Sequence, residues 1–308
     1  MSVSSASFWT ALHGSQPLLM DGASGTALLP LGLDCIERAH LSHPAVVRQL
    51  HESHAQAGAR VLLTCTFQAN PIALARVGLE DRLLEIARQS IRNARSAAPS
   101  CWVLGDVGPI LTPGSSVEFA DRDALQCTLE ALEGVDGILL ETCSSPAALH
   151  AIAFAQHRVA AVDGLPLLLS LTFQRDAAGR LVTRSGHAPE TYARHAVRHG
   201  VTALGVNCGR DIDLADLAEI LRRYRQETDL PLFVRPNAGS PVAGSHPRSP
   251  ADFRSAATLL RRAGAILLGG CCGTTAAHIA ALGQGLRDTD LTRWEEGGEP
   301  ARVSGRRG

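Results

Sequence analysis

Two adjacent cysteines near the end of the sequence, Cys271 and Cys272, are the residues best placed to do chemistry. They lie in Gly269-Gly270-Cys271-Cys272-Gly273, directly after an apolar run and directly before a helical pattern. Neighbouring cysteines do not easily form a disulfide with each other, and the flanking glycines let the backbone turn so that both sulfurs face one point. Cys208 also follows an apolar run and supplies a third thiol. Three thiolates with one open position are typical of catalytic zinc, so we predict a Zn²⁺ site.

The other cysteines need a separate interpretation, because a single cysteine at the end of an apolar run is more often an inert buried thiol. Cys35, Cys101 and Cys127 have no unusual sequence context, and we interpret them as structural. The vicinal pair differs, since glycines and cysteines occupy a place where a strand normally carries branched apolar side chains. Cys65 and Cys143 each end a predicted strand, and each is either part of a pocket wall or a spare thiol.

Composition narrows the class of function. The chain has 308 residues, of which 45% are hydrophobic and 19% charged, with a formal net charge of -1. This balance gives no indication of nucleic acid or an anionic membrane, and we expect small-molecule partners. The chain contains no lysine, so all 29 basic residues are arginine. A Walker-type phosphate loop, a pyridoxal Schiff base and a lysine nucleophile are therefore excluded.

The sequence predicts a cytoplasmic protein. Its N-terminus has no basic start followed by an apolar core of signal-peptide length, and no run of about 18 apolar residues could span a bilayer. In a reducing compartment the eight cysteines are more often free, buried or metal-bound than paired in disulfides. The oligomeric state is left open.

Apolar runs of strand length alternate with longer segments of helical period. Strands are expected at 18–20, 61–67, 102–107, 137–143, 166–173, 203–208, 231–236 and 265–270, and helices near 44–57, 79–97, 121–134, 145–158, 188–199, 211–227, 249–262 and 275–286. This alternation favours an α/β fold, a single-domain (β/α)8 TIM barrel, over a doubly wound open sheet, which normally uses fewer strands. We place the barrel at 17–287, after an N-terminal segment 1–16 and before a polar tail 288–308, which we expect to be disordered or a surface appendage.

The unusual polar segments all fall at the C-terminal ends of predicted strands. They are Asp21-Gly22-Ala23-Ser24-Gly25-Thr26, Thr64-Cys65-Thr66-Phe67-Gln68-Ala69-Asn70, Gly105-Asp106-Val107-Gly108-Pro109, Glu141-Thr142-Cys143 and Pro236-Asn237-Ala238-Gly239. TIM barrels build their catalytic face from these ends, so we expect the segments to meet the three cysteines in one pocket. Asp21 and Glu141 could instead cap the helices that follow, but an acid ending an apolar strand is costly without a partner or ligand.

Together, the segments around Asp21, Cys208, Asn237 and the vicinal cysteines resemble the homocysteine-binding domain of zinc-dependent homocysteine S-methyltransferases. The motifs occur in the same order and at the same strand ends, from about residue 17 to residue 286. The resemblance implies that Cys208, Cys271 and Cys272 hold zinc, and that the homocysteine thiolate takes the fourth position. It also implies that Asp21 and Glu141 bind the homocysteine amino group, and we expect further substrate contacts from Gly22, Ala23, Thr64, Asn207 and Asn237.

The residue types suit methyl transfer. A free thiol with a pKa of about 8.5 is mostly protonated at neutral pH, whereas coordination to zinc deprotonates it. Three cysteinate ligands add negative charge, which keeps the substrate sulfur electron-rich enough to attack a methyl group. A donor held in line with that sulfur supplies much of the remaining rate. Backbone amides of the glycine-rich turn after the first strand suit the carboxylate of the amino acid.

The methyl donor is the least determined part of this hypothesis. We favour S-methylmethionine or S-adenosylmethionine, and the alternatives are a separate corrinoid protein or betaine. The amino-acid sequences of several motifs resemble the barrel module of cobalamin-dependent methionine synthase more closely than they resemble the betaine enzymes. Gln68 stands where the betaine enzymes carry a tyrosine, and Thr142 stands where they carry an aromatic residue. Only 4% of the residues are aromatic, which is few for a protein that builds an aromatic cage around a quaternary ammonium.

Two other classes of function remain as alternatives. A three-cysteine zinc site could activate water for hydrolysis, although three thiolates make a weaker Lewis acid than histidines would, and no histidine lies beside the cysteines. The chain could also be a protein that binds thiols or metal without catalysis.

Overall fold

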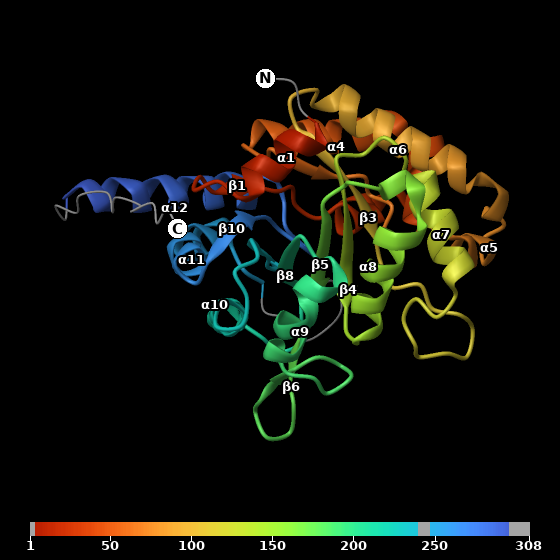
Figure 1. Cartoon of the computed structure of the whole chain (residues 1–308). Helices are drawn as coiled ribbons and strands as arrows, with labels where there is room; N and C mark the ends of the chain where they lie inside the picture. The colour runs from red at the N-terminus through yellow and green to blue at the C-terminus, as the bar shows by residue number, and fades with distance from the viewer. Residues whose placement is uncertain (1–3, 240–246, 296–308) are drawn as a thin grey trace.

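The sheet of the protein is a closed barrel. The structure, a computed structural model, describes residues 4–239 and 247–295, with side chains as far as Asp288. Within these residues eight parallel strands follow the order β1 (Leu18–Leu19), β10 (Ala265–Leu268), β9 (Leu232–Arg235), β8 (Ala203–Asn207), β5 (Leu167–Leu171), β4 (Gly137–Cys143), β3 (Trp102–Val107) and β2 (Val61–Leu63). A parallel bridge between Met20 and Val61 joins the first strand to the last. The predicted (β/α)8 barrel is confirmed, and the open sheet is wrong (Figure 1).

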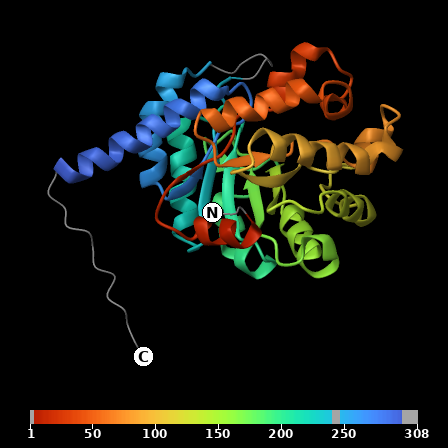
Figure 2. The ribbon, with the colours of Figure 1, turned by 90° about the horizontal axis from the view of Figure 1, so that it is seen from above.

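Helices surround the strands, as Figure 2 shows from above. The main ones are α4 (Pro44–Gln56), α6 (Leu83–Ala97), α7 (Arg122–Ala131), α8 (Ala147–Arg158), α9 (Pro189–Ala196), α10 (Leu214–Arg225), α11 (Pro250–Arg262) and α12 (Ala276–Glu295). Several begin where a side chain accepts a hydrogen bond from a backbone amide of the first turn, as Asp121, Asp213 and Ser249 do. Shorter elements are α2 (Gly25–Leu28), α3 (Ala39–Ser42), α5 (Pro71–Ala75) and the hairpin of β6 (Gln174–Arg175) and β7 (Leu181–Val182).

The N-terminal segment, for which no role was predicted from the sequence, packs against the end of the barrel where the strands begin. Residues Ser5–Leu12 form α1, whose Phe8 and Leu12 are buried in the cluster that fills the barrel interior. Trp102, the first residue of β3, donates a hydrogen bond from Nε1 to Ser7 Oγ at 2.9 Å. Because these contacts lie at the N-terminal ends of the strands, α1 covers the end opposite the predicted site.

At the other end of the chain, α12 continues past the predicted barrel boundary at residue 287 to Glu295. The first part of the predicted tail is therefore helical, and residues 296–308 lie outside the described residues. None of the helices in the described part of the chain is long and apolar enough to cross a membrane.

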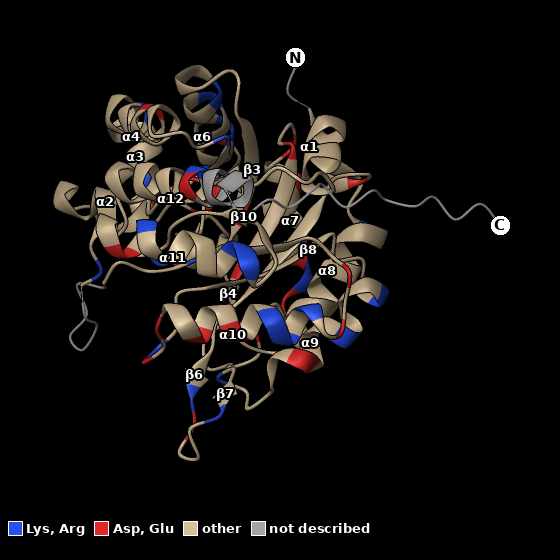
Figure 3. Ribbon diagram, turned by 90° about the vertical axis from the view of Figure 1, so that its left-hand side faces the viewer, with Lys and Arg blue, Asp and Glu red and all other residues tan. Residues whose placement is uncertain are grey.

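The outer helices carry both basic and acidic residues, as the blue and red segments of the ribbon show (Figure 3). Arg223 of α10 pairs with Glu190 of α9 at 2.6 Å, and Arg194 of α9 pairs with Glu227 at 2.8 Å. Pairs as exposed as that of Arg194 contribute little to stability, so the fit of α9 against α10 depends mainly on apolar contact.

Three histidines on the helices that follow β1 are buried. His40 belongs to α3, and His51 and His54 to α4. Burial lowers the pKa of His40 to about 4, of His51 to about 3 and of His54 to about 4. Nε2 of His51 and both ring nitrogens of His54 have no hydrogen-bond partner. The folded protein therefore keeps these rings neutral.

We predict that these histidines destabilise the fold at acid pH. The unfolded chain takes up protons below pH about 6.5 while the folded chain does not, so stability present above that pH is lost as pH falls toward 4. His51→Gln should reduce the slope of unfolding free energy between pH 6 and 4.5 by about 1.4 kcal/mol per pH unit. Urea unfolding at several pH values measures this slope, and the value at pH 8 serves as reference. An unchanged slope would contradict the assignment.

Candidate metal and substrate site

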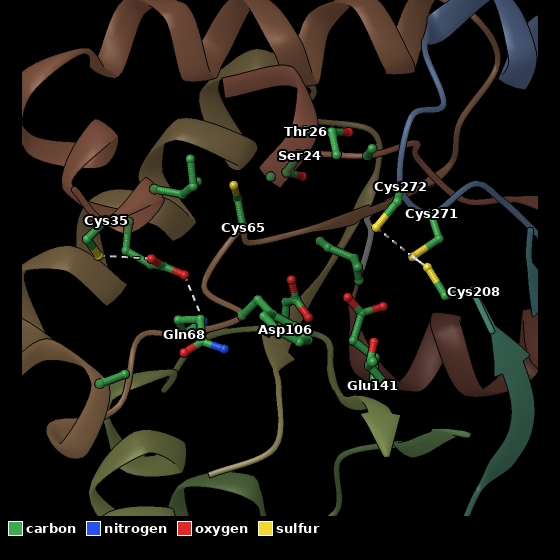
Figure 4. Close-up of a pocket in the computed structure, with 18 of the residues that line it drawn as sticks. Ser24, Thr26, Cys35, Cys65, Gln68, Asp106, Glu141, Cys208, Cys271 and Cys272 are labelled. Atoms are coloured by element: carbon green, nitrogen blue, oxygen red, sulfur yellow. Dashed lines mark hydrogen bonds between the residues drawn. The ribbon is translucent and has the colours of Figure 1, made fainter. Parts of the chain in front are cut away.

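The three predicted metal ligands meet at the C-terminal end of the barrel (Figure 4). Cys208 follows β8, and Cys271 and Cys272 follow β10. The Sγ atoms of Cys208 and Cys271 are 3.0 Å apart, those of Cys271 and Cys272 are 4.0 Å apart, and all three lie within 4.8 Å of one another. A tetrahedral zinc with Zn–S bonds of about 2.3 Å separates its sulfur ligands by about 3.8 Å. The free thiols therefore fit a thiophilic metal ion with small adjustments.

Protons are shared unequally among these thiols. Hydrogen bonds from Cys208 and Cys271 hold the pKa of Cys272 well below its ordinary value. The pKa of Cys208 is raised well above its usual range, because its hydrogen bonds with Cys271 and Cys272 and its burial favour the protonated form. These hydrogen bonds favour the thiolate form of Cys272, which is the form that binds a metal cation.

The glycines around the vicinal pair have two different roles. A Cβ on Gly270 would lie 2.3 Å from Thr274 Oγ1, and one on Gly269 would lie 2.6 Å from Met20 Cβ. These two glycines are required by close packing, which corrects the expectation that they let the backbone turn. Gly273, in contrast, has a φ of 77°, so the turn falls after the cysteines. Cys208 itself has a φ of 51°, a conformation costly for a residue with a side chain.

Asn207 holds the cysteine-bearing loops from behind. Its Oδ1 accepts hydrogen bonds from Ser170 Oγ at 2.6 Å and from the Thr142 backbone amide at 3.1 Å. Its Nδ2 donates to Thr142 Oγ1 at 2.8 Å and lies 3.6 Å from the Cys271 sulfur. Asn207 thus joins β4, β5 and β8 and contacts one of the candidate metal ligands.

The period of the strands places charged side chains above the apolar core. Leu104, Leu139 and Phe233 fill the barrel interior, and two residues further along the same strands come Asp106, Glu141 and Arg235. Because side chains two apart share a face of a strand, all three charges point into the barrel mouth. No individual role was predicted for Arg235 or Asp106 from the sequence. Both are charged residues in strands that are buried on both faces, and this was the signal that could have identified them.

Arg235 joins the two acids that the resemblance assigned to the substrate amino group. Its guanidinium forms ion pairs with Asp21, at 3.4 Å, and with Glu141. Asp21 also accepts a hydrogen bond from the Leu63 amide at 2.7 Å. Burial raises the pKa of Asp21 and of Glu141 to about 7 each, and the positive charge of Arg235 opposes this shift.

A cavity of about 720 Å³ opens beside the cysteines. Of the predicted site residues, Ala23, Glu141, Cys208, Cys271 and Cys272 line it. Asp21, Gly22, Thr64, Asn207 and Asn237 lie behind its wall. Cys65, with a φ of 61°, is part of the wall, whereas Cys143 is buried away from it. The cavity extends past Asp106 to Gln68 and Cys35 (Figure 4).

The residues behind the wall make contacts that fix the loops. Thr64 Oγ1 accepts a hydrogen bond from the Asp106 amide at 3.0 Å, and the Asn237 carbonyl accepts one from Arg248 at 2.9 Å. The Ala23 amide donates to Thr274 Oγ1 at 3.0 Å. A Cβ on Gly22 would lie 2.9 Å from His54 Nε2. The turn after β1 is therefore packed against the turn that carries the vicinal cysteines.

A closed parallel barrel with three converging thiols at its C-terminal end has the position and the ligand set typical of a metal site in a barrel enzyme. The model of the homocysteine S-methyltransferase family matches residues 18–286, and the chain belongs to that family. Methionine synthase of Mycobacterium tuberculosis is 31% identical over 287 residues, which cover 84% of this chain and 24% of that protein. Homocysteine S-methyltransferase of Escherichia coli is 29% identical over 304 residues, covering 86% and 94% of the two chains.

Solved structures agree with this assignment. The oxidized form of the homocysteine methyltransferase MmuM from Escherichia coli superposes with a TM-score of 0.70 and 29% identity, covering 89% of this chain and 98% of that one. Its metallated form gives a TM-score of 0.68 and 28% identity, covering 89% and 97%. The chain spans about a quarter of the length of the methionine synthases that it matches.

We predict that Asn207→Ala weakens metal binding about 10- to 100-fold, because residues that orient metal ligands have effects of this size. Competition with a chelator of known affinity measures the dissociation constant. Ser170→Ala is the matched control, since it removes a hydrogen bond to the same asparagine but contacts no sulfur. Equal metal affinity in Asn207→Ala and Ser170→Ala would contradict this role.

Proposed function

We propose that the protein is a zinc-dependent homocysteine S-methyltransferase that makes methionine with S-methylmethionine or S-adenosylmethionine as donor. The observation that carries the proposal is the convergence of three cysteine sulfurs at the wall of a cavity large enough for two small molecules. Membership of the family and the metallated form of a related methyltransferase support it. Its cytoplasmic location stays a prediction.

Zn²⁺ on these thiolates would lower the pKa of an incoming thiol, so that homocysteine reacts as its thiolate. Glu141 lines the cavity near the cysteines and is the acid best placed to bind the homocysteine ammonium. Asp21 lies behind the wall and acts through Arg235, which it holds against Glu141. The turn at residues 24–26 also lines the cavity and is the proposed site for the carboxylate of homocysteine.

The transfer itself is a displacement at carbon. The homocysteine sulfur forms a bond to the methyl carbon of the donor, and the bond between that carbon and the sulfonium sulfur breaks. The bonding electrons stay on the donor sulfur, which becomes a neutral thioether, and the homocysteine thiol proton leaves to solvent on binding. The chain's contribution is to hold both sulfurs in line and to exclude water.

The cavity wall argues against betaine as donor. Phe67 is the single aromatic residue among the described residues that line it, and Gln68 is its neighbour. Recognition of a quaternary ammonium normally uses several aromatic faces. A corrinoid protein remains the alternative methyl source, since the chain matches one part of longer methionine synthases.

We predict that zinc-loaded protein forms methionine from homocysteine with S-methylmethionine or S-adenosylmethionine, and much more slowly with betaine or a methylated corrinoid. Cys208→Ser should lose both the metal and the activity, because two thiolates hold zinc more weakly than three. Cys127→Ser, which changes an exposed thiol, is the control. Atomic absorption and methionine assays measure the two quantities. Unchanged zinc in Cys208→Ser, a preference for betaine, or hydrolysis without homocysteine would overturn the proposal.

A further inference from the structure

Asp106 is a buried acid that faces the cavity without a partner. Its backbone is fixed on both sides, because its amide donates to Thr64 Oγ1 at 3.0 Å and its carbonyl accepts from Thr66 Oγ1 at 2.8 Å. The residue is 4% exposed, lines the cavity, and its Oδ1 has no hydrogen-bond partner. Figure 4 shows the side chain between Glu141 and Gln68.

The other acids that line the cavity all have partners. Glu141 pairs with Arg235, and Asp34 pairs with Arg38 at 2.7 Å. Glu37 accepts hydrogen bonds from the Gln68 amide at 2.7 Å and from Cys35 Sγ at 3.0 Å. Arg235 pairs with Asp21 and Glu141 through its two terminal nitrogens and makes no ion pair with Asp106, while its Nε has no hydrogen-bond partner. A buried carboxyl without a partner is costly, and such groups mark places where a ligand binds.

We propose that Asp106 binds the positively charged, methyl-bearing centre of the donor, a sulfonium ion. This inference rests on the proposed function and extends it to the donor subsite. Two acids then divide the cavity: Glu141, next to the cysteines, takes the homocysteine ammonium, and Asp106, further along toward Gln68, takes the donor cation (Figure 4). Burial raises the pKa of Asp106 well above its ordinary value, the nearby negative charge of Glu141 adds to this, and the positive charge of Arg235 opposes it. A bound cation reverses the balance and favours the ionised form.

The position of the charge has a kinetic consequence. When the methyl group leaves, the sulfonium becomes a neutral thioether, so its attraction to Asp106 falls during the reaction. Asp106 therefore binds the donor more strongly than the transition state or the product, and its removal should raise KM for the donor without lowering kcat. The same charge selects sulfonium donors over uncharged ones.

The test compares two ligands that differ in charge and not in shape. S-methylmethionine carries a dimethylsulfonium group, and 2-amino-5-methylhexanoate carries an uncharged isopropyl group in its place. Isothermal titration calorimetry on the zinc-loaded protein should show about tenfold or tighter binding of the sulfonium, which corresponds to about 1.4 kcal/mol. In Asp106→Asn the two affinities should agree within about twofold. Asp34→Asn, which removes an acid already paired with Arg38, should keep the preference.

Two further readouts separate this role from a structural one. Asp106→Asn should keep the wild-type melting temperature, because it replaces a carboxyl that makes no side-chain hydrogen bond at Oδ1. It should also keep the KM for homocysteine within about twofold while the donor KM rises about tenfold. Equal binding of the two ligands by the wild type, no binding of the sulfonium, or a loss of homocysteine affinity in Asp106→Asn would overturn the inference. Methyl transfer without a sulfonium preference leaves the proposed function standing, whereas a preference without methyl transfer removes that function and keeps the cation site.

Discussion

A single buried guanidinium holds the mouth of this barrel together. Arg235 ends β9 and pairs with Asp21 after β1 and with Glu141 at the end of β4, so one side chain connects three strands that are far apart in sequence. Removing one partner from such a buried set leaves a charge without compensation, which typically costs about 3–5 kcal/mol. The cavity wall, the orientation of Glu141 and the turn after β1 all depend on this arrangement.

Some residues of the site line the cavity, and others lie behind the cavity wall and hold the lining residues in place. The cysteines, Glu141 and Asp106 face the cavity, where they can meet ligands. Asn207 lies behind them, where it sets the direction of loops whose backbone is strained at Cys208 and Thr142. Strained backbone persists where surrounding contacts over-determine it, and at Thr142 those contacts are the hydrogen bonds of Asn207. The chemistry proposed for the thiols therefore depends on polar contacts that substrate never touches.

The sequence was sufficient to predict the barrel and the convergence of the three cysteines, because alternation of strands and helices is local and motifs at strand ends share one rim. It was not sufficient for the ion pairs of Arg235, since a charge network across β1, β4 and β9 depends on which strands face one another. Strand lengths also differed: the strand expected at 61–67 ends at Leu63, because Cys65 adopts a left-handed conformation. The role of Phe8 was missed because a short segment with two adjacent aromatic residues, Phe8 and Trp9, gives no periodic signal.

The claim at the centre of this account is that the three cysteines hold a metal with a position open for the substrate thiol. X-ray absorption spectroscopy at the zinc edge, on loaded protein with and without homocysteine, measures the ligand set directly. We expect the zinc to have three sulfur ligands and one lighter atom at rest, and four sulfur ligands when homocysteine is bound. A spectrum that keeps three sulfurs at saturating homocysteine, or that shows fewer than three at rest, would contradict it.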